Sequence, residues 1–177
     1  MKILVLAGSP HKSGASNMLA HEFICGARDK GHNVAVLDVA HMKLGYCSGC
    51  DECKKNGECV QKDDSAVVRE EMLSADAVVF VTPVYYFGMS AQLKTAIDRF
   101  HGYGKELKNK GMKSAIIAAA ADKEEEVVSA LKAHYAKICS YLNFEIVGEV
   151  YGLGCAAPET TRNSSYMKDA YELGNSL

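Results

Sequence analysis

The stretch "KILVLAGSPHKSGASNMLAHEF", residues 2–23, carries most of the information about the fold. A nearly unbroken apolar run over residues 2–8 leads through a loop of small and hydroxyl residues into an amphipathic segment over residues 16–30. Strands of parallel sheets have such apolar runs, because helices cover both faces of the sheet. The stretch therefore predicts a buried strand, a tight loop and a helix that packs back on the sheet.

The same alternation recurs along the rest of the chain. Further strands are expected at residues 33–39, 77–82, 113–120 and 144–151. Further helices are expected at residues 64–74, 90–101, 123–142 and 164–174. Alternating strands and helices predict an α/β fold with a doubly wound, parallel five-stranded sheet and helices on both faces. The expected strand order is the flavodoxin-like 2-1-3-4-5, in a single domain over residues 1–177.

This topology also predicts where a ligand would bind. In open parallel sheets, ligands bind at the carboxyl ends of the strands, at the point where the strand order reverses. For the order 2-1-3-4-5 this point lies between the first and third strands. The loops after the first, third and fourth strands are therefore the expected site.

Composition excludes several classes of protein. The chain has 177 residues, is 48% apolar and carries a net charge of −2, with both signs mixed along it. This gives no electrostatic basis for binding nucleic acid or an anionic membrane, and no stretch resembles a signal peptide or a membrane span. The seven cysteines are odd in number and clustered. We therefore expect reduced thiols or metal ligands, and a cytoplasmic location.

The first loop, residues 7–17, has the chemistry of a phosphate site. It offers hydroxyl, amide and basic groups on Ser9, Ser13, Ser16, Asn17, His11 and Lys12. Free N–H groups and the positive end of the helix dipole favour an anion at the helix that follows. The loop matches neither a dinucleotide fingerprint nor a P-loop. A second interpretation stays open, in which Ser13 or Ser16 merely caps the helix.

The second loop offers a place for a flat ring. Pro83 directly follows the third strand and ends its hydrogen-bond ladder. Tyr85, Tyr86 and Phe87 come next, and Gly88 allows close backbone approach. Three consecutive aromatic side chains cannot all face one core, so at least one is expected at the mouth of the cleft. Ser90 is expected to cap the following helix.

The two loops together resemble those of the NAD(P)H-dependent FMN reductase and flavodoxin-like quinone reductase superfamily. The resemblance rests on "GSPHKSGASN" and "TPVYYFGMSAQLKTAIDR" at this spacing, and it covers nearly the whole chain. Within that superfamily, the cysteine-rich loop at residues 46–60 is similar to that of the iron–sulfur flavoprotein branch. The resemblance implies FMN as cofactor and NAD(P)H as reductant. It also implies a homodimer or homotetramer.

The resemblance also assigns residues to the cofactor. Ser9, Ser16 and Asn17 would hold the FMN phosphate, and His11 and Lys12 lie where relatives carry a basic residue. The isoalloxazine ring would be lined by Pro83, Val84, Tyr85, Tyr86, Phe87 and Gly88. Relatives have a glycine-rich loop after the fourth strand, whereas this chain has "AAAADKEEE". The backbone of Ala120, Ala121 and Asp122 is expected to approach the flavin there. No catalytic side chain is expected, because the flavin carries the chemistry.

Four cysteines, Cys47, Cys50, Cys53 and Cys59, have the spacing C-x2-C-x2-C-x5-C. Zinc sites have two pairs separated by a dozen or more residues, so zinc is the least favoured ligand. The spacing is similar to that of [4Fe–4S] ferredoxins, and Gly49 and Gly57 would let the loop wrap a cluster. Alternatively, the first three thiols lie on one face of a helix, as core or redox-active thiols. Both interpretations stay open.

The principal hypothesis is an FMN-dependent NAD(P)H oxidoreductase that reduces flavins, quinones or similar small acceptors. The alternative is an electron carrier that relays electrons between a [4Fe–4S] cluster and FMN, with ferredoxin as partner. A third class is a non-catalytic phosphate-ligand binder with a zinc loop.

Overall fold

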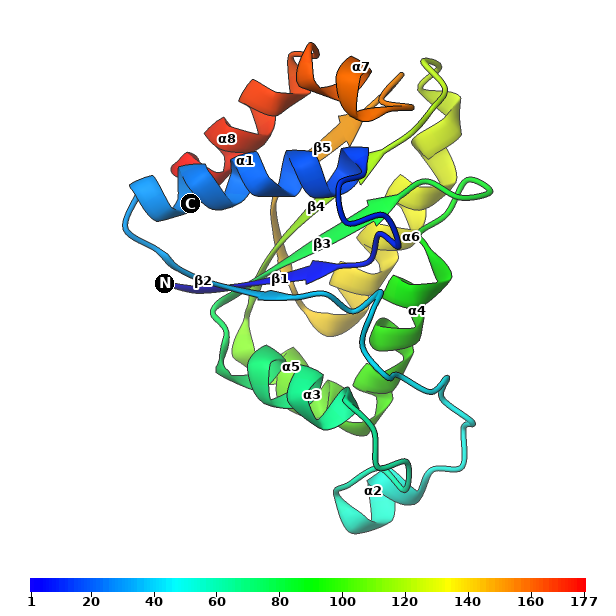
Figure 1. Ribbon diagram of the computed structural model, residues 1–177. Coiled ribbons are helices and arrows are strands. Elements are labelled where there is room, and N and C mark those ends of the chain that lie inside the picture. Colours follow the sequence, from blue (N-terminus) through cyan, green and yellow to red (C-terminus); the bar gives the residue numbers. More distant parts are fainter.

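The computed structural model describes residues 1–177 and has one sheet of five parallel strands. The strands are β1 (Lys2–Ala7), β2 (Asn33–Leu37), β3 (Ala77–Pro83), β4 (Lys113–Ala119) and β5 (Glu145–Gly152). Their order is β2-β1-β3-β4-β5 (Figure 1). The predicted fold class and strand order are therefore confirmed, and the strand bounds differ from the prediction by at most two residues.

Helices cover both faces of the sheet, as a parallel sheet requires. One face carries α1 (Ala15–Asp29), α7 (Pro158–Arg162) and α8 (Tyr166–Ser176) (Figure 1). The other carries α3 (Ser65–Ser74), α4 (Ala91–Asp98), α5 (Gly104–Lys110) and α6 (Glu126–Leu142). A 3₁₀ helix, η1 (Arg99–Gly102), continues α4, and the short α2 (Glu52–Asn56) projects from the body.

Two hydrophobic cores follow from the period of the strands. On β1, Ile3 and Val5 face the core under α1 and α8, whereas Leu4 and Leu6 face the core under α4 and α6. All four side chains are fully buried. Side chains of a strand alternate between the two faces, so an apolar run fills both cores at once.

Three short helices were not predicted, namely α2, α5 and α7. Each has seven residues or fewer, and α2 has no buried residue. A segment this short shows too little of the helical period to be recognised from its pattern. The predicted helix over 123–142 begins only at Glu126, because residues 120–125 form the loop after β4.

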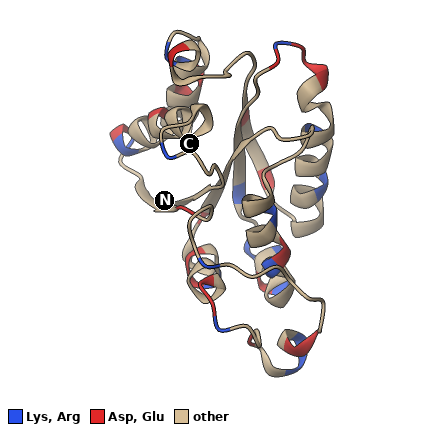
Figure 2. Ribbon diagram, turned by 45° about the vertical axis from the view of Figure 1, so that its right-hand side comes forward, with Lys and Arg blue, Asp and Glu red and all other residues tan.

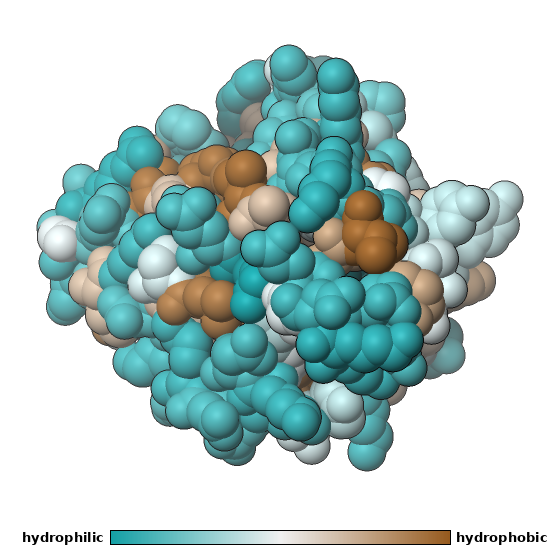
Figure 3. All heavy atoms as spheres, turned by 90° about the horizontal axis from the view of Figure 1, so that it is seen from below, coloured by the Kyte–Doolittle hydropathy of each residue, from teal (hydrophilic) through white to brown (hydrophobic).

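The outer surface is polar and mixed in charge. Lysine, arginine, aspartate and glutamate lie side by side on the helices (Figure 2). Seen from below, the molecule shows a mainly hydrophilic face with small separate apolar patches (Figure 3). No helix combines the length and the apolar character that crossing a bilayer requires.

The chain approaches its neighbours closely where β1 ends. The Gly8 N–H donates to the Val81 carbonyl over 2.8 Å. The Gly8 carbonyl accepts from the buried Ser90 hydroxyl at 2.6 Å, and the same hydroxyl accepts from the Leu93 N–H at 3.2 Å. Ser90 therefore caps α4, as predicted, and also ties α4 to the end of β1.

Gly8→Ala tests this close approach. A Cβ atom on residue 8 would lie 2.6 Å from Leu93 Cβ and 3.0 Å from Ser90 Oγ. We expect the free energy of unfolding, measured by urea denaturation, to fall by about 1–3 kcal/mol because the core cannot accommodate the added atom. Gly104→Ala is the control, since its nearest atom is a Leu142 methyl at 4.0 Å. Equal stability of wild type and Gly8→Ala would contradict this account.

Candidate functional site

A cleft of about 610 Å³ opens at the carboxyl ends of β1, β3 and β4. The predicted residues that line it are Ser9, His11, Lys12, Ser16, Pro83, Val84, Tyr85 and Ala121. The three predicted loops therefore meet at one edge of the sheet. The other predicted cofactor residues lie beside the cleft without lining it, namely Asn17, Tyr86, Phe87, Gly88, Ala120 and Asp122.

The β1 loop presents free hydrogen-bond donors to this cleft. Helix α1 begins after Gly14, which has no side chain to cap it, and its first turn has no acidic residue. The first N–H groups of a helix have no partner within the helix, so here they are available to an anion. The expectation that Ser13 or Ser16 caps α1 is wrong, because Gly14 occupies the N-cap position.

Three side chains contribute to this N-terminal anion site, the cradle, which we define as residues 9–17. Ser9 and Ser16 are buried, and Ser9 Oγ bonds the backbone of His11 at 3.3 Å. Asn17 Nδ2 donates to the carbonyl oxygens of His11 and Lys12, at 3.1 and 3.3 Å. Asn17 Oδ1 is buried without a partner. An unsatisfied buried acceptor is costly, so a ligand hydroxyl that donates to it would be stabilised.

The aromatic loop after β3 is a tight turn closed by two hydrogen bonds of 3.0 Å between the backbones of Tyr85 and Gly88. Its central residues, Tyr86 and Phe87, have φ of 47° and 64°, as in a type I′ turn. This left-handed conformation costs about 1–2 kcal/mol for each residue with a large side chain. Tyr86 is fully exposed and Phe87 is 55% exposed. The expectation that at least one ring is exposed at the cleft is met by Tyr85, which lines the cleft and is 43% exposed.

The loop after β4 takes its shape from neighbours on both sides. The Ala119 carbonyl accepts from the Val84 N–H at 2.8 Å, and the Ala120 N–H donates to the Gly152 carbonyl at 2.9 Å. Asp122 Oδ1 accepts from the backbone N–H groups of Lys123 and Glu124. Ala120 is buried, whereas Ala121 and Asp122 are exposed. Only Ala121 of the three lines the cleft.

Sequence reasoning missed a fourth wall of the cleft. Cys155, Ala156 and Pro158, from the segment after β5, also line it. The strand order contained the signal, because β5 lies beside β4 and its carboxyl end lies at the same edge of the sheet. The segment has no charged or aromatic residue in "GLGCAAP" that would have indicated a site.

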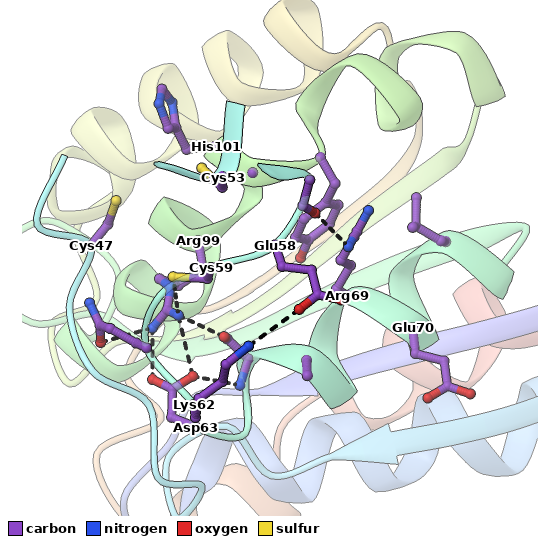
Figure 4. A pocket seen from close by; sticks show the side chains of 17 residues that line it. Cys47, Cys53, Glu58, Cys59, Lys62, Asp63, Arg69, Glu70, Arg99 and His101 are labelled. Carbon is purple, nitrogen blue, oxygen red and sulfur yellow. Dashed lines mark hydrogen bonds and ion pairs between the residues drawn. The ribbon is translucent and has the colours of Figure 1, made fainter. Parts of the chain in front are cut away.

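The cysteine loop, residues 46–60, lies apart from this cleft. Cys47, Cys53 and Cys59 line a second cavity of about 600 Å³ together with residues of α3 and η1 (Figure 4). Cys50 is exposed and does not line it. No three metal-binding side chains are close enough to hold one metal ion in this conformation. Only Cys53 is helical, so the interpretation of three thiols on one helix face is wrong.

One of the three thiols of this cavity accepts a hydrogen bond from a cationic donor. Arg99 Nη2 donates to Cys59 Sγ over 3.1 Å. Tyr103, a residue only 3% exposed, also lines this cavity, and its buried hydroxyl has no hydrogen-bond partner. A cationic N–H donor beside a thiol sulfur suits a thiolate-bound, negatively charged group. The backbone amide of Glu52 and the Ser48 hydroxyl also lower the pKa of the exposed Cys50 thiol.

Beneath the loop lies a buried ion pair. Arg99 is only 6% exposed, and its Nη1 lies 2.8 Å from Asp63 Oδ2. Burial acts to raise the pKa of Asp63, but the hydrogen bonds from Arg99 and Ser65 outweigh it and hold the pKa far below its usual range. Asp63 in turn favours the charged form of Arg99 and so raises its pKa, against the effect of burial.

Comparison of sequences places these loops among known oxidoreductases. The model of the NADPH-dependent FMN reductase family matches residues 1–156. An iron–sulfur flavoprotein of Archaeoglobus fulgidus is 31% identical over 179 residues, which cover 100% of this chain and 79% of the relative. An iron–sulfur flavoprotein of Methanocaldococcus jannaschii is 34% identical over 112 residues, which cover 62% of this chain and 58% of the relative.

Comparison of structures shows the same fold. An NAD(P)H:quinone oxidoreductase from Methanothermobacter marburgensis superposes with a TM-score of 0.79 at 18% identity, over 100% of this chain and 96% of that one. An FMN-dependent NADH-azoreductase from Bacillus anthracis, solved in complex with FMN, superposes with a TM-score of 0.69 at 17% identity, over 100% and 99%.

Tyr86→Asn tests the strain in the aromatic turn. Asparagine adopts positive φ more readily than tyrosine, and the fully exposed Tyr86 side chain has no packing to lose. We expect the free energy of unfolding to rise by about 1 kcal/mol. Tyr46→Asn is the control, since Tyr46 is 80% exposed with ordinary φ. A similar gain in both variants would show that the effect does not come from the turn.

Asp63→Asn tests the buried ion pair. The folded-state pKa of Asp63 lies below the unfolded value of about 3.9, so its carboxylate stabilises the fold above that pH and loses this effect as the pH falls below it. We expect the variant to be less stable by about 1.5–3 kcal/mol at pH 7. The difference in free energy of unfolding between wild type and Asp63→Asn should become smaller when urea denaturation is repeated at progressively lower pH.

Asp98→Asn is the matched control, because Asp98 pairs with Lys94 on the surface. Its effect at pH 7 should stay below about 1 kcal/mol. A pH-independent difference between Asp63→Asn and wild type would contradict the role assigned to the Asp63 charge.

Proposed function

The chain belongs to the NADPH-dependent FMN reductase family, and we propose that it uses FMN to pass electrons from NAD(P)H to a flavin, a quinone or a similar small acceptor. The observation that carries this proposal is the uncapped start of α1, which opens into the same cleft as the aromatic turn. One part of the cleft suits a phosphate and the other suits a planar ring. FMN joins these two groups in one molecule.

The cradle would hold the phosphate of FMN. The N–H groups at the start of α1 and the hydroxyls of Ser9 and Ser16 would donate to its oxygens, with Lys12 adding positive charge at the rim. Asn17 Oδ1 would accept from a hydroxyl of the ribityl chain and so gain the partner that it lacks. The buried and unpaired groups of the cradle therefore fit this ligand.

The ring would lie between the β3 and β4 loops. Tyr85, Val84 and Pro83 line the cleft on one side and Ala121 on the other. Bound there, FMN would supply the hydride and electron chemistry of the family. The chain would contribute position and shelter from water, and the strained turn would keep Tyr85 at the cleft while leaving the mouth open. No side chain of the cleft is needed as a general acid or base.

A second candidate function involves the cysteine loop. The spacing of the four cysteines, the cavity that three of them share with Arg99 and Tyr103, and the names of the relatives favour a [4Fe–4S] cluster. The chain would then relay electrons between cluster and FMN, with ferredoxin as partner. Because Cys50 lies outside the cavity, binding would require the loop to bring the fourth sulfur in.

We also propose that the protein acts in the cytoplasm as a homodimer or homotetramer. Reduced thiols suit that compartment, and all seven cysteines are unpaired here. Tyr86 and Phe87 expose apolar rings that a second copy of the chain would cover. Light scattering of the purified protein measures the oligomer directly, and a monomer would contradict this part of the proposal.

Anaerobic purification followed by chemical analysis tests the function. We expect about one FMN per chain and rapid NAD(P)H oxidation in the presence of a quinone. Iron and acid-labile sulfide at about four each per chain would support the cluster. A colourless protein with stoichiometric zinc and no affinity for FMN would contradict both candidate functions.

Ser16→Asp tests the cradle. A carboxylate at the start of α1 would repel the FMN phosphate but would leave the ring pocket intact. We expect the dissociation constant for FMN, measured by fluorescence quenching, to rise at least about tenfold, while that for riboflavin stays within about twofold. Riboflavin is the matched control, since it lacks only the phosphate. Equal weakening of both ligands would contradict phosphate binding in the cradle.

A further inference from the structure

The cysteine loop has no core of its own. None of residues 46–60 is buried, so hydrophobic packing cannot hold this segment in place. Three polar side chains from the body reach it instead. Arg69 Nη1 donates to the Gly57 carbonyl at 3.0 Å, His101 Nε2 lies 2.7 Å from Asp51 Oδ1, and Arg99 reaches Cys59.

Arg99 differs from the other two in being buried and in bonding both ends of the loop. Its Nη1 donates to the Gly45 carbonyl at 2.7 Å, just before the loop, and to Asp63 Oδ2 at 2.8 Å, just after it. Its Nη2 donates to Cys59 Sγ at 3.1 Å and to Ser65 Oγ at 2.7 Å. One planar guanidinium therefore holds together the two ends of the loop. We call these ends, residue 45 and residues 61–65, the neck of the loop.

The neck is shaped around this side chain. The Gly45 N–H donates to Asp63 Oδ2 at 2.8 Å, and Gln61 Nε2 donates to the Tyr46 carbonyl at 2.9 Å. A Cβ atom on Gly45 would lie 2.2 Å from Gln61 Oε1. The two chain segments of the neck are therefore so close that a side chain at residue 45 would clash. Without Arg99, the Gly45 carbonyl and the Asp63 carboxylate would face each other with no donor between them.

Arg99 is itself held by the fold that forms the flavin cleft. It directly follows α4, and the first turn of α4 is fixed to the end of β1 by Ser90. The position of the guanidinium is therefore fixed relative to the sheet, and the hydrogen bonds of the guanidinium fix the cysteine loop in turn. The close-up view shows Arg99 directly beneath Cys59, with Asp63 below it (Figure 4).

We infer that Arg99 is the positioning residue of the cysteine loop, which holds the two ends of the loop together and places Cys59 at the cavity that Cys47 and Cys53 also line. The positioning role does not depend on the proposed function. The inference rests on that function only for the identity of the ligand, a group held by thiolates. The role needs the forked shape of arginine, because a lysine ammonium is a single point that cannot span Gly45, Cys59 and Ser65 together.

Arg99→Ala and Arg99→Lys test this role by hydrogen exchange and mass spectrometry on reduced, iron-free protein. In both variants, we expect amide exchange of residues 46–60 at short times to quicken about tenfold or more, since several charge-assisted hydrogen bonds are lost. Peptides from β1 and β3 should stay protected at those times. Arg162→Lys, on exposed α7 and away from the loop, is the matched control and should exchange like wild type.

Chemical rescue separates positioning from a general loss of stability. Millimolar guanidinium ion added to Arg99→Ala should slow loop exchange back toward the wild-type rate, because the cation can occupy the vacated site beside Asp63. Urea at the same concentration has a similar shape without the charge and should not. The inference would be overturned if residues 46–60 exchanged at the wild-type rate in either variant. It would also be overturned if urea slowed loop exchange as much as guanidinium does. If Arg99→Ala does not fold, the test relies on Arg99→Lys. Amide exchange of residues 46–60 at the wild-type rate in that variant would then be sufficient to overturn the inference.

Reconstitution with iron and sulfide provides a separate readout. If the loop binds a cluster, Arg99→Ala should retain FMN at the wild-type level but bind several-fold less iron and sulfide, with recovery in guanidinium. Wild-type protein that binds no iron would refute the cluster proposal and leave the exchange result to decide the role of Arg99. Full iron binding by Arg99→Ala without guanidinium would overturn the inference.

Discussion

The hydrogen bond from Ser90 to the Gly8 carbonyl is the contact on which the rest of the structure depends. It joins the end of β1 to the start of α4, and so brings together the two loops that form the cleft. Such a contact needs a glycine at residue 8, since any Cβ there would overlap Leu93. It also needs a buried hydroxyl that donates once and accepts once, which Ser90 does. Few other residue pairs could satisfy both conditions.

Helix α4 links the two chemically distinct regions of the molecule. Its start lies at the cleft, and Arg99 at its end lies beneath the cysteine loop. The two regions are stabilised by different forces. The cleft is built on the apolar core of the sheet, whereas the cysteine loop is held by polar contacts to Arg69, Arg99 and His101. The loop is therefore the part of the molecule most sensitive to its ligands and to the loss of single charges.

Strained or unsatisfied groups occur at both of these regions. Tyr86 and Phe87 adopt left-handed conformations at the cleft, Asn17 Oδ1 lacks a donor beside the cradle, and the Tyr103 hydroxyl lacks a partner at the cysteine cavity. Each costs free energy in the isolated chain, and a bound ligand would offset the cost for the two polar groups.

The sequence by itself determined the sheet, its strand order and the loops that meet at its edge, because apolar runs and amphipathic periods are local properties. It also identified Ser90 as a cap and predicted that at least one of the three aromatic residues is exposed. It did not reveal Cys155, Ala156 and Pro158 as a wall of the cleft, or Arg99 as the anchor of the cysteine loop. Arg99 contacts residues 34 to 54 positions away, and only tertiary structure brings such groups together. The arrangement of the four thiols was likewise decided by contacts outside the loop, since its spacing suited a helix face and a cluster equally.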